Sequence, residues 1–175
     1  MQLDHPAIFA VKHNAGSFGT LHTLAQDAVR SKGPISLHTA LGVRTNTEVV
    51  QGTYEAVGRS DIPALLDLLT ENVQWTFQGP SVMPFAGTRR GREGVAEFFS
   101  LVEGNLEFQE FEPREFVAQG DTVVVLGFER SLVKSTGRTF KQEWAHVYKL
   151  RDGKVAEFLA LEDTAAHAGA FDATT

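Results

Sequence analysis

The sequence contains no cysteine, which excludes disulfides, thiolate metal centres and a cysteine nucleophile. It is also poor in basic charge: 16 lysines and arginines against 22 aspartates and glutamates give a formal net charge of −6, unlike a nucleic-acid-binding surface. No apolar run approaches the roughly 20 residues that span a bilayer, and the first residues lack the pattern of a secretory signal. We therefore expect a cytoplasmic protein that binds neither nucleic acid nor membranes.

The first 45 residues differ from the remainder in charge and in histidine content. They hold four of the six histidines and carry a net charge of +2, whereas residues 46–175 carry −8. The segment has no sustained helical or strand period, and its histidines lack the close spacing of metal ligands. We predict a mobile or loosely docked extension over residues 1–45, one domain over residues 46–175, and neither a metal site nor a cofactor.

Clear secondary-structure patterns begin after residue 45. Capping residues followed by apolar residues at helical spacing predict helices that begin near residues 46, 61 and 91. Alternating strands bounded by glycine-containing turns follow, and a closing helix is predicted over 164–171. The predicted strands are 73–77, 106–116, 121–134, 138–150 and 155–162, with a loop over 78–88. This order predicts an α+β fold in which three N-terminal helices pack on a curved antiparallel sheet.

Two short turns, centred on Thr136 and Asp152, set the predicted register of the last three strands. The resulting rows across the sheet are Arg130–Gln142–Glu162, Phe128–Trp144–Ala160 and Leu126–His146–Phe158. We assign these rows to the helix-covered face because they carry the large aromatic residues. Their polar side chains are then buried, which is costly unless they pair with one another or bind a ligand.

The opposite face of these strands is apolar as well. Its predicted members are Val123, Val125, Ala145, Val147, Leu159 and Leu161. A strand face in contact with water is normally polar, so something covers this one. We predict a homodimer in which two sheets pack face to face. The alternative covers are the extension over residues 1–45 and the closing helix.

Short segments between residues 46 and 171 carry a resemblance to a known family. They are 48–56 (EVVQGTYEA), 61–69 (DIPALLDLL), 72–75 (NVQW), 84–87 (PFAG), 91–99 (GREGVAEFF), 144–147 (WAHV), 152–155 (DGKV) and 162–165 (Glu-Asp-Thr-Ala). The chain resembles the NTF2-like superfamily and, within it, the SnoaL-like group of ketosteroid-isomerase-related proteins. This resemblance implies a cone-shaped α+β fold with a deep, mostly apolar cavity between helices and sheet.

The resemblance also implies candidate chemistry. Isomerases of the superfamily use a carboxylate base and an oxyanion hole, but the matching positions here hold Phe77, Thr53 or Tyr54, and His146. The Asp-Arg-Asp set of its epoxide hydrolases has no counterpart at the matching positions. Its polyketide cyclases use a buried acid–base pair, for which His146 and Glu162 stand in here.

His146 and Glu162 are therefore the candidate catalytic residues. A histidine exchanges a proton near neutral pH, and a carboxylate in an apolar cavity acts as a base; the alternatives are a core histidine and a salt bridge from Glu162 to Arg130. The candidate ligand-binding residues are Tyr54, Trp75, Phe77, Phe128, Arg130, Gln142, Trp144 and Phe158. Among them, Arg130 is suited to hold a carboxylate or enolate oxygen of the ligand.

Two functions remain open at this point. The first is a cofactor-independent isomerase, cyclase or lyase that acts on a small hydrophobic carbonyl compound. The second is a non-catalytic ligand-binding or dimerisation module with the same cavity, because one fold serves unrelated functions.

Overall fold

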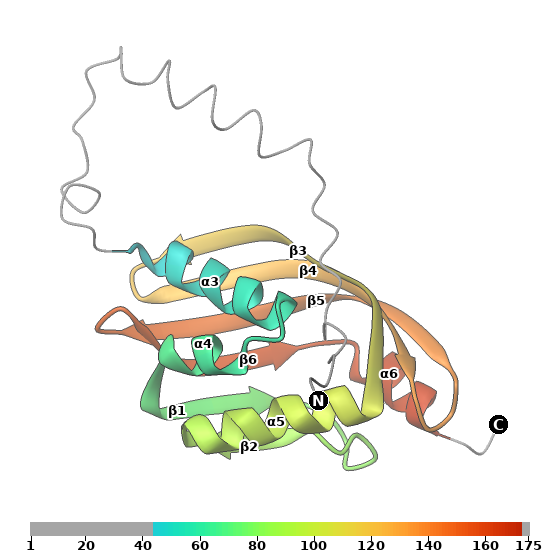
Figure 1. The fold of residues 1–175 in the computed structure, drawn as a ribbon. Coiled ribbons are helices and arrows are strands. Elements are labelled where there is room, and N and C mark those ends of the chain that lie inside the picture. Colours follow the sequence, from blue (N-terminus) through green and yellow to red (C-terminus); the bar gives the residue numbers. More distant parts are fainter. Residues whose placement is uncertain (1–43, 173–175) are drawn as a thin grey trace.

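One six-stranded sheet, with helices against it, makes up the part of the chain that the computed structural model describes, residues 44–172. The elements in chain order are α3 (Asn46–Gly58), α4 (Ile62–Asp67), β1 (Leu69–Phe77), β2 (Gly87–Arg90), α5 (Gly91–Asn105), β3 (Leu106–Gln119), β4 (Thr122–Val133), β5 (Thr139–Arg151), β6 (Lys154–Leu161) and α6 (Thr164–Phe171). Helices α3, α4 and α5 cover one face of the curved sheet (Figure 1). The predicted α+β fold is confirmed.

The predicted extension over residues 1–45 lies outside the described residues, apart from Arg44 and Thr45. No helix within the described range is long and apolar enough to cross a membrane.

Local side-chain bonds explain where the helices begin. Thr45 and Glu48 form a reciprocal capping box at the start of α3. Asp61 caps α4, with a proline in its first turn, and Asp163 caps α6. Each cap satisfies a backbone N–H that the helix leaves without a partner.

The strand order is β2-β1-β6-β5-β4-β3. Neighbouring strands are antiparallel except for β1 and β6, which run parallel. Strand β2 overlaps the last two residues of the predicted loop 78–88 and pairs with β1, which the sequence pattern did not indicate. Strand β3 continues through Pro113 to Gln119, because the proline lies at a register irregularity of an edge strand, where a missing N–H is tolerated.

The register between β4 and β5 differs from the prediction by one residue. Gln142 lies opposite Glu129 and Trp144 opposite Gly127. The cause is the connecting loop: Val133 pairs with Arg138 through a backbone bond, and Gly137 has a φ of 69°, so four residues form the turn. A shift by one residue moves every side chain of β4 to the other face.

The register between β5 and β6 differs by two residues and therefore keeps each side chain on its predicted face. His146 lies opposite Ala160, and Tyr148 opposite Phe158. Asp152 and Gly153 form a two-residue turn with positive φ at both positions. A further irregularity between Lys149 and Leu150 completes the offset.

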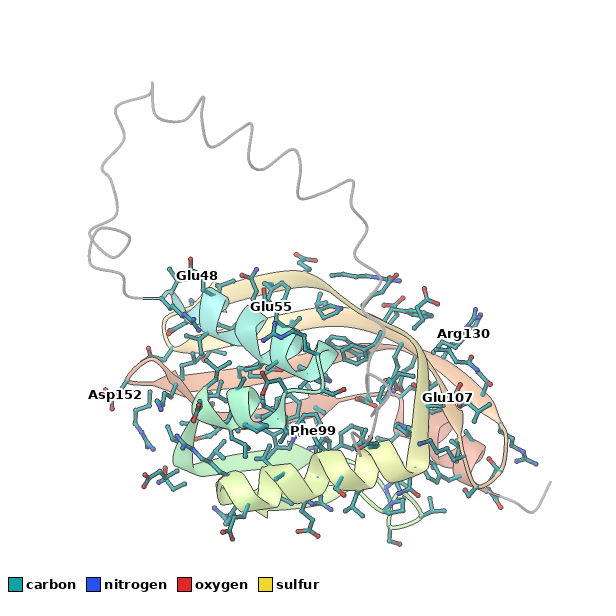
Figure 2. All side chains as sticks on the ribbon, in the orientation of Figure 1. Glu48, Glu55, Phe99, Glu107, Arg130 and Asp152 are labelled. Atoms are coloured by element: carbon teal, nitrogen blue, oxygen red, sulfur yellow. The ribbon has the colours of Figure 1, made fainter. Side chains whose placement is uncertain are left out.

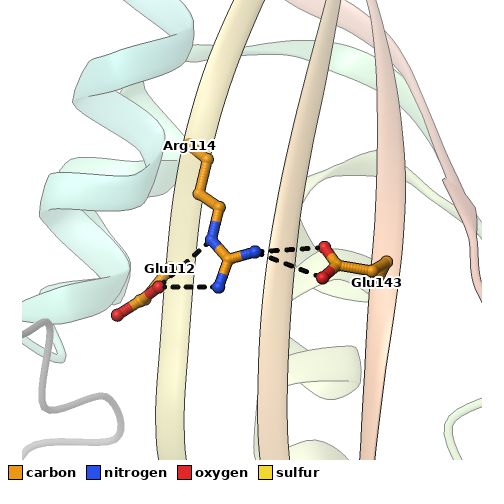
Figure 3. Close-up of polar contacts among 3 residues, drawn as sticks. All are labelled: Glu112, Arg114 and Glu143. Carbon is orange, nitrogen blue, oxygen red and sulfur yellow. Dashed lines mark hydrogen bonds and ion pairs between the residues drawn. The ribbon is translucent and has the colours of Figure 1, made fainter.

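Phe128 and Arg130 therefore lie on the outer face of the sheet, away from the helices, and their predicted place in the cavity was wrong. Figure 2 shows Arg130 at the outside of the molecule, whereas Phe99 of α5 lies between helix and sheet. The Arg114 guanidinium lies 4.9 Å from the centre of the Phe128 ring. It also pairs with Glu112 at 3.0 Å and Glu143 at 3.2 Å (Figure 3).

The core fills the layer between the helices and the inner face of the sheet. It is unusually rich in rings: Trp75 stacks on Phe158 with a centroid separation of 3.9 Å, and Phe77 packs edge-on against Phe85. Such pairs add to the stabilisation that area burial gives. A cavity lies inside this aromatic layer.

Candidate functional site

A cavity of about 70 Å³ lies between the helices and the inner sheet face. This volume exceeds several-fold the roughly 10–15 Å³ that one water needs. Most of its lining is apolar or aromatic, including Trp75, Phe77 and Phe158. A few polar side chains interrupt this lining, which is the usual composition of a small-molecule site.

The polar side chains form one connected group at the sheet. The Tyr54 hydroxyl lies 2.9 Å from His146 Nδ1, and His146 Nε2 lies 3.6 Å from Glu162 Oε1. The other Glu162 oxygen, Oε2, lies 3.2 Å from His167 Nδ1 and accepts from Gln142 Nε2 at 2.6 Å. The same Gln142 nitrogen donates to Glu129 Oε1, also at 2.6 Å.

Five separate parts of the chain bring this group together. Tyr54 comes from α3 and His146 from β5, while Glu162 follows directly after β6. Glu129 points inward from β4, and His167 faces the sheet from α6. The register of the sheet and the docking of two helices therefore both determine the geometry.

His146 lies in an aromatic enclosure. Its ring centre is 4.1 Å from that of Trp144 and 5.0 Å from that of Phe158. Burial lowers the pKa of His146, and the neighbouring Glu162 carboxylate opposes this shift only in part. His146 Nε2 is buried and has no hydrogen-bond partner among the described residues. At neutral pH this histidine is therefore a neutral imidazole.

The groups around Glu162 stabilise its anionic form although its side chain is only 5% exposed. Burial raises its pKa, but hydrogen bonds and charge from His146 and His167 outweigh this effect and bring the pKa below its ordinary value. Its Oε2 atom also accepts from the Gln142 amide. The predicted salt bridge from Arg130 to Glu162 is absent from the described residues, because Arg130 lies on the other face.

The groups around Glu129 instead favour its protonated form. Glu129 is 3% exposed and lines the cavity. Burial first, and then the charge of Glu162, raise the pKa of Glu129 well above its ordinary value, while the bond from Gln142 opposes this shift. Burial likewise raises the pKa of Tyr54, so the Tyr54 hydroxyl keeps its proton.

One set of side chains could hold a metal ion: the ligand atoms of Glu129, Glu162 and His167 lie within 4.8 Å of one another. Two carboxylates and an imidazole suit several divalent ions. A donor nitrogen of Gln142, however, bonds to both carboxylates. The observed arrangement is thus a hydrogen-bonded network, and a cation would have to displace that amide.

The structure brings most of the predicted site residues together. Tyr54, Trp75, Phe77, His146, Phe158 and Glu162 line the cavity. Gln142 and Trp144 do not line the cavity. The Gln142 amide donates to both Glu129 and Glu162, and the Trp144 ring stacks on the His146 ring. Phe128 and Arg130 are excluded by the register of β4.

Sequence reasoning missed Glu129 and His167. A signal for Glu129 was present, since small residues occupy alternate positions along β4 from Val123 to Val133 and the glutamate falls in the same phase. A signal for His167 was weaker: it lies one turn before the buried residues Ala170 and Phe171 on α6.

Comparison with known proteins agrees with this architecture. A family model described as the SnoaL-like domain matches residues 50–158, and the chain belongs to that family. No protein of curated function matches the chain.

Several solved structures are similar to the chain. An NTF2-like protein from Burkholderia xenovorans is 37% identical, with 73% of this chain and 95% of that chain covered and a TM-score of 0.68. An NTF2-like protein of unknown function from Burkholderia pseudomallei is 31% identical, with 72% and 96% covered and a TM-score of 0.67. TerC, co-crystallised with polyporic acid, is 28% identical, with 72% and 97% covered and a TM-score of 0.64.

Proposed function

We propose that the cavity binds a small hydrophobic carbonyl compound and that His146 and Glu162 move a proton on it, in an isomerase- or cyclase-type reaction without a cofactor. The observation that carries this proposal is that His146 and Glu162 lie 3.6 Å apart and both line one aromatic cavity. The co-crystallisation of the similar protein TerC with polyporic acid supports a small organic ligand.

The atoms of His146 suggest its role. The Tyr54 hydroxyl keeps its proton and can donate to His146 Nδ1, so Nε2 carries the ring proton and points it at Glu162, whose carboxylate acts as the general base. The abstracted proton rests on Glu162, and the His146 ring, 3.6 Å away, favours its return to the ligand because it stabilises the carboxylate. Glu162 in turn is held by Gln142 and His167. Tyr54 is thus a positioning residue, and the aromatic walls hold the apolar part of the ligand.

A proton-exchange assay tests this proposal. 2-Tetralone is a small apolar ketone with an acidic hydrogen beside the carbonyl, and its uptake of deuterium from D₂O is followed by proton NMR. We expect the protein to accelerate exchange, and His146→Ala and Glu162→Gln each to reduce that acceleration by about 100-fold or more.

Arg130→Gln is the matched control, because Arg130 lies on the outer face and is exposed. It should leave the exchange rate unchanged. Binding of 2-tetralone, seen as a raised melting temperature, without any accelerated exchange would favour the second candidate, a non-catalytic binding module.

We also propose that the protein is a homodimer through the outer sheet face. Val117, Val124, Val147 and Leu159 form one apolar row across β3, β4, β5 and β6, and Leu126, Ala145 and Leu161 lie beside it. Val123 and Val125, which the sequence assigned to this face, are instead fully buried on the inner one. The remaining row still presents a larger apolar surface than an isolated exposed leucine would.

A further inference from the structure

Three side chains that commonly bind metal ions meet in the wall of the cavity. The ligand atoms of Glu129, Glu162 and His167 lie within 4.8 Å of one another, and all three residues line the cavity. Glu162 Oε2 and His167 Nδ1 are 3.2 Å apart. Two ligands of a tetrahedral zinc ion, each about 2.0–2.1 Å from the metal, lie about 3.3 Å from each other. These two atoms therefore have the separation that one ion requires.

The Gln142 amide nitrogen lies between the two carboxyl groups, where a cation would lie. It is 2.6 Å from an oxygen of Glu129 and 2.6 Å from an oxygen of Glu162. The amide oxygen, Gln142 Oε1, is buried and has no hydrogen-bond partner within residues 44–172. A half-turn of the amide would displace the N–H group and point this oxygen at the carboxyl groups. Amide oxygens bind metal ions, so Oε1 would be a fourth ligand.

A second histidine points at the same oxygens. His146 is 7% exposed, and its Nε2 lies 3.6 Å from Glu162 Oε1 without a hydrogen-bond partner among the described residues. With an ion on Glu162 Oε2, the N–H group of His146 would bind the other oxygen of that carboxylate. Carboxylates that bind metals are usually held by such a second bond, which fixes their orientation.

The charge of the surroundings also favours a cation. No lysine or arginine lines the cavity, and none forms an ion pair with Glu129 or Glu162 within residues 44–172. Two buried carboxylates without a basic partner are costly. A divalent ion between them would offset both charges.

The donor set indicates the class of ion. One imidazole nitrogen together with carboxylate and amide oxygens suits zinc and similar transition-metal ions. Magnesium instead prefers an octahedron of oxygen atoms and keeps several of its waters. The His167 ring is held in place by aromatic neighbours, with its centre 4.2 Å from that of Phe140 and 5.8 Å from that of Phe77.

We propose that Glu129, Glu162 and His167, with Gln142 after a half-turn of its amide, bind one divalent transition-metal ion such as zinc. The sequence-based expectation of no metal site considered only the histidines of residues 1–45. The inference goes beyond the proposed function, which involves no ion. Because the ion would engage a lone pair of Glu162, its binding would inhibit proton transfer by that carboxylate.

Calorimetric titration of the full chain with ZnCl₂, after removal of metal with EDTA, tests the site. Four of the six histidines lie in residues 1–45 and could bind zinc as well, so the decisive quantity is the difference between variants. Glu129→Gln removes one carboxylate. His167→Phe removes the imidazole and keeps a ring among the aromatic neighbours. Each variant should weaken the tightest zinc-binding event by about 10-fold or more.

Glu143→Gln is the matched control, since the Glu143 side chain is 73% exposed on the outer face of the same sheet. It should leave the zinc affinity unchanged. MgCl₂ should bind the parent about 10-fold or more weakly than ZnCl₂. Equal zinc affinity of the parent, Glu129→Gln and His167→Phe would overturn the site, and equal affinity of the parent for the two metals would overturn the class of ion.

Urea unfolding gives a second readout, because an ion that binds only the folded chain raises its stability. Zinc should raise the urea midpoint of the parent and of Glu143→Gln more than that of Glu129→Gln or His167→Phe. The same rise in all four proteins would mean that zinc binds elsewhere, and the inference would be wrong.

Deuterium exchange of 2-tetralone separates this inference from the proposed function. Zinc should slow exchange by the parent, and EDTA should restore it. Exchange that persists at full zinc occupancy would contradict the inhibition. Accelerated exchange by a parent that binds zinc no better than its variants contradicts only the metal site. Specific zinc binding by a parent that does not accelerate exchange contradicts only the proposed function.

Discussion

The His146 imidazole lies where burial and a carboxylate act on it in opposite directions. Burial disfavours the charged ring, and Glu162 at 3.6 Å favours it. This balance leaves the His146 ring neutral at neutral pH beside an anionic Glu162, as a proton-transfer pair requires. The two carboxyl groups near His146 differ from each other: the pKa of Glu162 is lowered, whereas the pKa of Glu129 is raised.

His146 should make stability depend on pH. Since its folded pKa is lowered, the unfolded chain takes up a proton more readily than the folded one as the pH falls below about 6.5. The parent should therefore lose stability relative to His146→Gln as the pH falls through that value. Urea unfolding over a pH series measures the difference, and a gap that widens in favour of the parent at low pH would contradict the assignment.

Gly127 allows the indole of Trp144 to lie against β4. A Cβ there would overlap the Trp144 ring and would lie 2.6 Å from the backbone oxygen of Glu112. Gly127→Ala should destabilise the protein by about 1–3 kcal/mol or more in urea unfolding. Gly104→Ala is the control: beyond its chain neighbours and the backbone of α5, no atom of the described residues lies within 4 Å of a Cβ there, so this change should stabilise by up to about 1 kcal/mol.

At the scale of elements, α6 connects the site to one end of the sheet. Its His167 contacts Glu162, and the Thr136 hydroxyl, in the loop between β4 and β5, donates to the Ala170 backbone oxygen of the helix at 2.7 Å. The cap from Asp163 fixes where the helix begins. The orientation of Glu162 therefore depends on a short helix.

Asp163→Ala should cost about 1 kcal/mol of stability, because a backbone N–H at the start of α6 loses its partner. Asp163→Asn should retain most of that stability, since asparagine is an equally good N-cap. Chemical unfolding of the two variants beside the parent gives the comparison. Equal losses in both would mean that the charge of Asp163, and not its cap, is what α6 needs.

The elements were easier to predict than their register. The starts of the helices near residues 46, 61, 91 and 164, and the alternation along β4 and β5, could be predicted because they depend on neighbouring residues. The phase of β4 depends on whether the turn before β5 has three residues, as predicted for 135–137, or four, as in the structure, where Gly137 has a positive φ. This difference of one residue in turn length placed Arg130 inside in the prediction and Glu129 inside in the structure.

The candidate site shows the same limit. His146 and Glu162 could be found because the two-residue error between β5 and β6 preserved their face. The Glu129–Gln142–Glu162 network could not, because it needs three strands in correct register. His167 depends in addition on how α6 docks against β5, which no local pattern encodes.

At the scale of the whole molecule, the sheet has two apolar faces and the helices cover one of them (Figure 1). Leu126 and Leu161 are each 41% exposed on the uncovered face. The Arg114 ion pairs lie on that same face and are exposed enough to contribute little stability by themselves (Figure 3).

The double variant Leu126→Glu, Leu161→Glu should convert the proposed dimer to a monomer, because two sheets that meet there would bury four unpaired carboxylates. Light scattering coupled to size exclusion measures the mass. Val82→Glu is the control, since Val82 is 45% exposed in the loop between β1 and β2. A parent protein with the mass of a monomer would contradict the dimer.

The central claim is that His146 and Glu162 form a proton-transfer pair in which the His146 ring is neutral and its Nε2 proton points at the Glu162 carboxylate. Proton–nitrogen correlation NMR of the histidine side chains at neutral pH reports both the charge and the tautomer of the ring. The account predicts a neutral His146 ring with its proton on Nε2 and with Nδ1 accepting from the Tyr54 hydroxyl. An imidazolium, or a proton on Nδ1, would contradict it.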